Sequence, residues 1–151
     1  MRIAIAADHA GFELKASLVR WLQQHGHDVH DYGTTSTQAV DYPEYARQVA
    51  QAISGRQADR GVLVCGTGIG MAMAANRTNG ARAAVLRSTQ DAQLSREHND
   101  ANIACFGGRM TTPQDAEQWL NVWLDTPFAG GRHERRVQQI DVFPSKEHAR
   151  S

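Results

Sequence analysis

The stretch RGVLVCGTGIGMAMAANR (residues 60–77) joins a short apolar run, a glycine-rich turn and the beginning of a helix. Residues 60–65 have the length and composition of a buried strand, and the small and apolar residues from 70 onward favour a helix. A strand that leads through a tight turn into a helix is the building unit of a parallel sheet. The stretch therefore predicts an α/β fold.

The same alternation of strand and helix extends from this stretch in both directions. Further strands are predicted at 2–7, 27–33, 81–86 and 101–107, and helices at 12–26, 42–55, 89–99, 112–124 and 132–142. Parallel strands need crossover helices, which cover both faces of the sheet. We therefore expect residues 1–151 to form a single domain with a three-layer αβα, Rossmann-like fold and a five-stranded parallel sheet. The tail at 143–151 carries no recognisable motif.

The composition excludes several classes of function. The chain has 16 Lys and Arg residues and 16 Asp and Glu residues, a balance that indicates neither a nucleic-acid partner nor a membrane surface. No apolar run reaches the roughly 18 residues of a membrane span, and the N-terminal residues lack the pattern of a signal peptide. We therefore expect a cytoplasmic protein. Cys65 and Cys105 would be free thiols there, because they are far apart and match no metal spacing.

Chemically active residues follow three of the predicted strands. Asp8 and His9 follow the first strand, Cys65 and the GTGIG turn follow the third, and residues 107–109 follow the fifth. Because the binding sites of open parallel sheets lie at the carboxyl ends of the strands, we expect these segments to converge.

The turn GTGIG (66–70) has the chemistry of an anion site rather than of a nucleotide site. Its spacing differs from the dinucleotide fingerprint G-x-G-x-x-G, and no Gly-Lys-Ser/Thr follows as in a Walker A loop. What remains is a nest of backbone N–H groups at a helix start, which can hold a phosphate or a developing oxyanion. Thr67 adds a hydroxyl donor.

Two interpretations of Cys65 are open at this level. As a small residue that closes a strand, it would only pack in the core, as we expect for Cys105, whose strand has no glycine turn behind it. Beside the nest, however, its thiolate would be stabilised, as a general base or nucleophile at neutral pH requires.

Two further groups have both a structural and a functional interpretation. Asp8 is suited to capping the first helix, whereas His9 beside it is positioned to meet an anion. Arg132 and Arg136 are four residues apart and share a helix face, which suits a phosphate. A solvated basic face paired with Glu134 is the structural alternative.

Seven stretches of the chain together resemble one known family. They are IAIAADHAGFELK, DYGT, VDYPEYA, GVLVCGTGIGMAMAANR, ARAA, SREHNDANIACFGGR and GGRHERRV, which span residues 3 to about 137. In order and spacing they resemble the RpiB/LacA/LacB family of sugar-phosphate isomerases, in particular its ribose-5-phosphate isomerase B branch. The resemblance implies an aldose–ketose isomerase that interconverts ribose 5-phosphate and ribulose 5-phosphate through an enediolate, with no metal and no other cofactor.

The resemblance also implies a role for each matching residue. Cys65 is similar to the base that takes the C2 proton, and the turn to the anion hole for the enediolate, in which Thr67 assists. Asp8 would hydrogen-bond the sugar and help relay protons between its oxygens. The other implied substrate contacts are those of Gly66, Gly68, Ile69 and Gly70 with the enediolate, of Tyr42 with the sugar, and of His9, Arg109, Arg132 and Arg136 with the phosphate.

His98 and Asn99 need a second subunit in this scheme. By resemblance, His98 is the acid that opens the furanose ring, and Asn99 holds a sugar oxygen. Both precede the fifth strand, so topology places them at the edge opposite Cys65. The family is dimeric, with active sites completed by a neighbouring subunit, which accounts for this placement. The resemblance thus implies a homodimer with shared active sites and leaves open whether dimers pair into tetramers.

The family has branches that differ in the residue that serves as the catalytic base. One branch has a cysteine at the position of Cys65, and another has a glutamate a few residues beyond the turn. The positions after Gly70 read MAMAAN and hold no carboxylate, so the chain resembles the cysteine branch.

Two other functions are open from the sequence. An isomerase of a six-carbon sugar phosphate, allose 6-phosphate or galactose 6-phosphate, would use the same proton transfer in a pocket of different depth. A non-catalytic phosphate-binding domain with a redox thiol would give His98 no special role.

Overall fold

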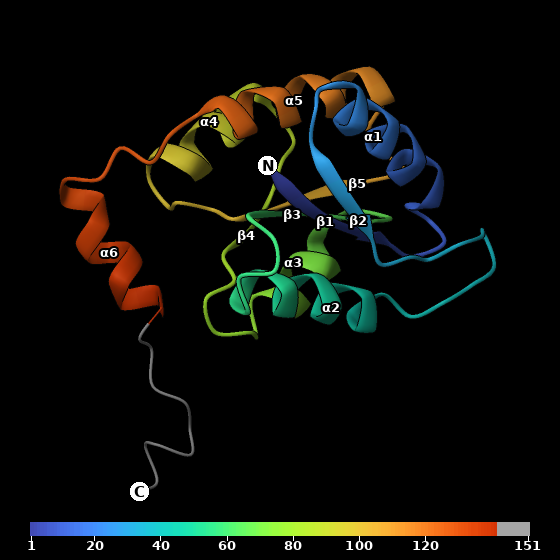
Figure 1. Ribbon diagram of the computed structural model, residues 1–151, viewed down its shortest axis with the longest axis horizontal. Coiled ribbons are helices and arrows are strands. Elements are labelled where there is room, and N and C mark those ends of the chain that lie inside the picture. Colours follow the sequence, from blue (N-terminus) through green and yellow to red (C-terminus); the bar gives the residue numbers. More distant parts are fainter. Residues whose placement is uncertain (142–151) are drawn as a thin grey trace, which may run out of the picture.

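The structure of the chain is a computed structural model that describes residues 1–141 (Figure 1). Its strands are β1 (Arg2–Ala7), β2 (Asp28–Asp31), β3 (Arg60–Cys65), β4 (Ala83–Val85) and β5 (Ile103–Gly107). Its helices are α1 (Phe12–Gln24), α2 (Tyr42–Ser54), α3 (Ile69–Ala75), α4 (Thr89–Glu97), α5 (Pro113–Asp125) and α6 (Arg132–Asp141). Each expected strand and helix is present within a few residues of its expected bounds. The tail at 143–151 lies outside the described residues.

The strands form one parallel sheet in the order β2-β1-β3-β5-β4. This confirms the expected five-stranded sheet. The register pairs Ala7 with Val64 and Cys65 with Gly107. The three central strands β1, β3 and β5 therefore end at nearly the same level, and the segments that follow them emerge side by side.

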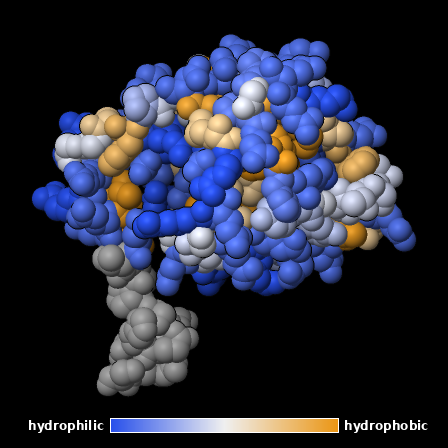
Figure 2. Space-filling view, in the orientation of Figure 1, coloured by the Kyte–Doolittle hydropathy of each residue, from blue (hydrophilic) through white to orange (hydrophobic). Residues whose placement is uncertain are grey.

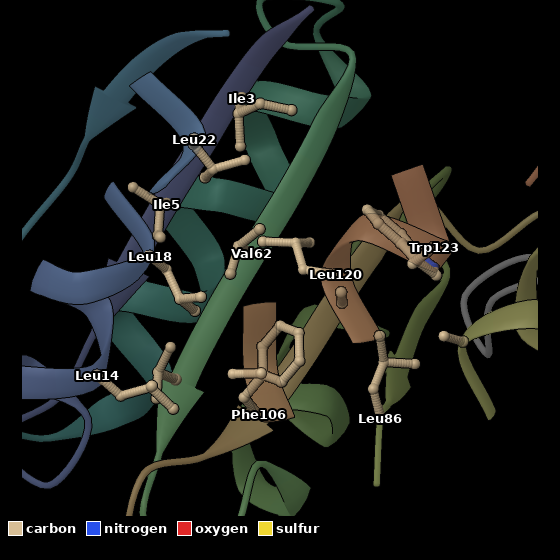
Figure 3. Packing of buried hydrophobic residues seen from close by; sticks show 14 of the residues in the cluster. Ile3, Ile5, Leu14, Leu18, Leu22, Val62, Leu86, Phe106, Leu120 and Trp123 are labelled. Carbon is tan, nitrogen blue, oxygen red and sulfur yellow. The ribbon is translucent and has the colours of Figure 1, made fainter. Parts of the chain in front are cut away.

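Helices cover both faces of the sheet, as expected, and the two faces bury different side chains. Along β1, Ile3 and Ile5 face the core beneath α1, α4 and α5, whereas Ala4 and Ala6 face α2 and α3. The small alanine side chains allow α2 to pack close to the sheet. Figure 3 shows larger side chains of the core beneath α1, α4 and α5, among them Leu14, Leu18, Leu22, Phe106, Leu120 and Trp123.

Helix α6 lies apart from both helical layers. Of its residues, Val137 alone is buried. Among the contacts that tie it and its approach to the rest of the chain, the Ala129 N–H donates to the Glu97 carbonyl across 3.1 Å, and Arg82 pairs with Asp141 across 2.8 Å. In Figure 1, α6 lies at the left end of the molecule, and the loops that follow β1 and β2 lie at the right.

The face of the molecule in Figure 2 is mostly hydrophilic, with separate apolar areas between the polar side chains. No helix within residues 1–141 is long and apolar enough to cross a membrane. Among the described residues, the large apolar side chains that are exposed are Met1, Tyr42, Ile69, Met73, Met110 and Ile140.

Candidate active site

A pocket of about 460 Å³ lies at the carboxyl edge of the sheet, where β1, β3 and β5 end together. The residues that line it are Asp8, Tyr42, Cys65, Gly66, Thr67, Ile69, Gly70, Met73 and Arg109. All of them except Met73 are candidate site residues of the sequence analysis. The structure therefore brings these candidates together, and we call the group the carboxyl-edge pocket.

Cys65 is the last residue of β3, and it lines this pocket with 5% of its surface exposed. The backbone N–H of Gly68 donates a hydrogen bond to the Cys65 Sγ across 3.2 Å. Gly68 has a φ of 82°, and a Cβ there would lie 3.1 Å from the backbone carbon of Phe106. The turn therefore requires glycine to aim this N–H at the sulfur.

Cys105 provides an internal contrast. It lies in β5 with no exposed surface, and it packs in the core beneath α2 and α3. Burial raises the pKa of its thiol, and the nearby Cys65 raises it further. Cys105 is therefore held in the neutral form at neutral pH, as a packing residue would be.

Thr67 presents its hydroxyl to the pocket. Its Oγ1 accepts a hydrogen bond from the Ile69 N–H across 3.3 Å. Because a hydroxyl can accept and donate at once, the hydrogen of Thr67 is still available to an oxygen of a bound ligand.

The first and last glycines of the turn make room for two other side chains. A Cβ on Gly66 would lie 3.1 Å from Nη1 of Arg109, so the guanidinium lies directly over that glycine. A Cβ on Gly70 would lie 2.6 Å from the ring of Tyr42. Absence of side chains at these two positions lets a cation and an aromatic ring close over the turn.

Asp8 and His9 are fixed by backbone hydrogen bonds. Asp8 is buried, and its Oδ1 accepts from the N–H groups of Ala10 at 3.0 Å and Gly11 at 3.1 Å. The interpretation of Asp8 as the cap of α1 is wrong, because the N-cap is Gly11 and Asp8 instead orders the turn before the helix. The Nδ1 of His9 accepts from the Val40 N–H across 3.2 Å, which assigns the ring hydrogen to Nε2 and leaves it free to donate.

His98, Asn99, Arg132, His133 and Arg136 do not line the carboxyl-edge pocket, and we call them the α4–α6 cluster. His98 is the C-cap of α4, and its ring stacks on that of His133 in α6, with centroids 4.3 Å apart and an angle of 16° between the rings. Desolvation, followed by the charges of His98, Arg132 and Arg136, lowers the pKa of His133. The cluster therefore concentrates positive charge at the end of the molecule opposite the loops after β1 and β2 (Figure 1).

An ionic clasp around Asp100 holds the α4–α6 cluster in place. Asp100 has a φ of 47°, and its Oδ1 accepts from Nη1 of the buried Arg96 across 2.7 Å. Arg82 reaches the other oxygen of Asp100 at 3.5 Å and also binds Asp141 at the end of α6. Arg96 donates in addition to the carbonyl of Thr126, on the approach to α6. The turn after α4 and both sides of α6 are thus joined through two arginines.

Sequence reasoning missed the contributions of His133 and Asp100. His133 stands within the basic run GGRHERR, beside Arg132, and that position was its only sequence signal. Asp100 directly follows Asn99, but its pairing with Arg82 depends on the sheet bringing β4 beside β5. Both roles arise from contacts between elements that are distant in the sequence.

Anion binding is the ligand chemistry that these side chains suit. The pocket offers the guanidinium of Arg109 and the N–H groups of the turn, whereas His9, which follows Asp8, is not among the lining residues. Within residues 1–141, no group of three or more His, Cys, Asp or Glu side chains is arranged to hold a metal ion.

Comparison with known proteins identifies the family. The model of the ribose/galactose isomerase family matches residues 3–140. The chain belongs to this family. Over 145 residues it is 43% identical to a protein of Escherichia coli named ribose-5-phosphate isomerase B, covering 96% of this chain and 97% of that protein. The family membership expected from the sequence is confirmed.

Solved structures of isomerase-family proteins share the fold. A ribose 5-phosphate isomerase RpiB from Thermotoga maritima has a TM-score of 0.91 and 49% identity, covering 93% of this chain and 97% of that one. A ribose-5-phosphate isomerase B from Clostridium thermocellum has a TM-score of 0.94 and 41% identity, covering 100% of both chains. The αβα fold class is therefore confirmed as well.

Proposed function

We propose that this chain is an aldose–ketose isomerase that interconverts D-ribose 5-phosphate and D-ribulose 5-phosphate. The observation that carries the proposal is the Cys65 sulfur, which accepts the Gly68 N–H at 3.2 Å in a pocket that also holds a carboxylate, a hydroxyl and a guanidinium. A base, a proton relay, an oxyanion site and an anion anchor are the parts that this isomerisation needs. The relatives from Escherichia coli and Thermotoga maritima, which bear the name ribose-5-phosphate isomerase, support the substrate.

The reaction moves one proton between carbons and another between oxygens. The Cys65 thiolate takes the proton from C2 of the open-chain aldose, and the C–H electron pair becomes the C1–C2 double bond of an enediolate. The N–H groups of the turn and the Thr67 hydroxyl stabilise the charge that develops on O1. The thiol then returns the proton to C1, while Asp8 relays the O2 proton to O1, which yields the ketose.

Ring opening and phosphate binding fall to the α4–α6 cluster in this proposal. His98 donates a proton to the ring oxygen of the furanose as the C1–O4 bond breaks, and the O1 hydroxyl loses its proton to water to become the aldehyde. Asn99 holds a sugar oxygen. Arg132 and Arg136, with His133 between them, bind the phosphate together with His9 and Arg109. The cluster lies outside the pocket of its own chain, so the proposal requires a homodimer in which the cluster of one subunit closes the pocket of the other.

Exposed apolar side chains at the pocket support this dimer. Ile69 and Met73 line the pocket and are 42% and 67% exposed, and Met110, whose side chain lies against Gly107 at the end of β5, is 56% exposed. A second subunit seated here would remove these side chains from water, which favours association. The largely exposed α6 is the element that reaches outward from the other end.

Assays with ribose 5-phosphate and allose 6-phosphate, run side by side, test the substrate. We expect kcat/KM to be at least about tenfold higher for the five-carbon substrate, because a pocket closed for it leaves the extra carbon misplaced. A preference for allose 6-phosphate would assign the six-carbon activity to the chain. No turnover of either compound would favour a phosphate-binding domain with a redox thiol.

A substrate without a ring tests the role of His98. Erythrose 4-phosphate cannot close a furanose, because its O4 carries the phosphate. We expect His98→Ala to lower kcat on ribose 5-phosphate about 100-fold or more, and to lower kcat on erythrose 4-phosphate far less. His30→Ala, on the exposed strand β2, is the matched control. Equal losses on both substrates would rule out ring opening as the role of His98.

A further inference from the structure

Arg87 lies in the segment after β4, and its side chain contacts the glycine turn that follows β3. Its Nη2 donates a hydrogen bond to the Thr67 carbonyl oxygen across 3.2 Å. Its own backbone N–H donates to Oδ2 of Asp91 in the first turn of α4, across 3.0 Å. The second contact fixes the backbone of Arg87, so that its guanidinium is directed at the turn. Arg87 has no part in the chemistry proposed above.

The carbonyl that Arg87 contacts belongs to the same peptide group as the N–H on the catalytic sulfur. The Thr67 C=O and the Gly68 N–H are the two ends of one planar amide. The guanidinium lies on the oxygen, and the Cys65 Sγ accepts from the nitrogen at 3.2 Å. Hydrogen bonds in such a chain polarise one another, so a cation on the oxygen makes the N–H a stronger donor.

The end of β5 leaves room for this contact. In the sheet order, β5 lies between β3, which carries Cys65, and β4, which leads to Arg87. A Cβ on Gly107, the last residue of β5, would lie 3.0 Å from the carbonyl carbon of Thr67. Any side chain at this position would push the turn away, and the glycine lets the peptide lie close above β5 within reach of Arg87.

We propose that Arg87 is a positioning residue for Cys65, which acts through the Thr67–Gly68 peptide to hold an N–H on the sulfur and to stabilise the thiolate. The inference rests on the proposed role of Cys65 as the base, and it adds Arg87 as the group that stabilises the thiolate form of this cysteine. The guanidinium contributes both orientation, by holding the peptide plane, and positive charge near the sulfur.

Other ionisable groups also face Cys65. They are Asp8 after β1, Tyr42 at the start of α2, Cys105 in β5 and Arg109 after β5, whereas α3 contributes no ionisable side chain. Replacement of Arg87 leaves all of them in place. A change in thiolate formation in an Arg87 variant is therefore due to the guanidinium.

The pH profile of Cys65 alkylation by iodoacetamide, with the label located by mass spectrometry, tests the proposal. In Arg87→Gln we expect the midpoint of the profile to move up by about half a pH unit, and kcat to fall roughly two- to threefold with little change in KM. Arg87→Lys keeps the charge and should retain most of the wild-type profile. Arg20→Gln removes an exposed arginine of α1 and should leave the midpoint unchanged.

An alkylation midpoint in Arg87→Gln that equals the wild-type midpoint would overturn the proposal, whatever happens to kcat. The alkylation profile does not depend on isomerase activity. A shifted midpoint in a chain that turns over no sugar phosphate would therefore uphold the link from Arg87 to Cys65 while refuting the proposed function. An active isomerase with an unshifted midpoint would refute the role of Arg87 alone.

Discussion

The carboxyl-edge pocket and the α4–α6 cluster are held in place by different means. The pocket is formed where three paired strands end, and glycines allow Tyr42 and Arg109 to close over the turn. The cluster depends on the end of α4, the clasp around Asp100 and a helix that buries one residue. The pocket is therefore part of the sheet architecture. The cluster projects from it and is attached by the contacts around Asp100 and at the end of α4.

The two regions also differ in the functions proposed for them. Groups proposed for proton transfer lie in the pocket, and groups proposed for ring opening and most of the phosphate binding lie in the cluster. In the proposed homodimer, the two regions at opposite ends of each subunit would be two half-sites, and two copies related by a twofold axis would form two whole sites. Variants of the two regions should then fail in different ways.

The largest effect is expected in the pocket, from Cys65→Ala. Loss of the base should lower kcat about 10²- to 10⁴-fold with a much smaller change in KM, as steady-state kinetics would measure. Cys105→Ala is the matched control, because the same residue type lies one strand away in the core. It should lose about 1 kcal/mol of folding free energy and keep its kcat. Near-normal turnover of Cys65→Ala would refute the base assignment.

The next largest effect is expected in the cluster, from Arg132→Met and Arg136→Met. Each removes a charge-assisted hydrogen bond to phosphate, worth about 1.5–3 kcal/mol, and should raise KM roughly 10- to 100-fold. Arg135→Met, in the same helix, is the control with the same loss of charge. If all three variants raised KM equally, general electrostatic attraction rather than specific binding would explain the basic run.

A smaller effect is expected from Asp100→Asn, which breaks the clasp. Arg96 is 4% exposed and Asp100 33% exposed, so loss of the pair should cost about 1–3 kcal/mol and lower Tm by several degrees. Activity should fall with it, since His98 and α6 lose their common anchor. Asp59→Asn breaks the exposed pair with Arg2 and should change Tm little. Full activity in Asp100→Asn would show that the clasp does not orient the cluster.

The sequence predicted the pocket better than the cluster, for a physical reason. Strand and helix periodicity, with the rule that sites lie at the carboxyl ends of parallel strands, was sufficient to bring Asp8, Cys65 and Arg109 together. The same topology placed His98 at the opposite edge. These inferences need only the order of the elements and the pairing of the strands.

Contacts between distant side chains could not be predicted in this way. The stack of His98 on His133 depends on the path of residues 126–131, for which the sequence contains no periodic pattern. The reach of Arg87 to Thr67 depends on the exact height of the turn above Gly107. Asp8 shows the same limit, since its hydrogen bonds order a turn rather than cap the helix that follows.

The most direct test of the shared site is complementation between two inactive chains. Cys65→Ala and His98→Ala subunits, each with its own affinity tag, are co-expressed, and mixed dimers are verified by sequential capture. Half of randomly paired dimers would be mixed, and each would contain one site with both native residues, so the mixture should recover about a quarter of wild-type activity. Mixed dimers with no more activity than the separate variants would contradict the account, because Cys65 and His98 would then have to act within one subunit.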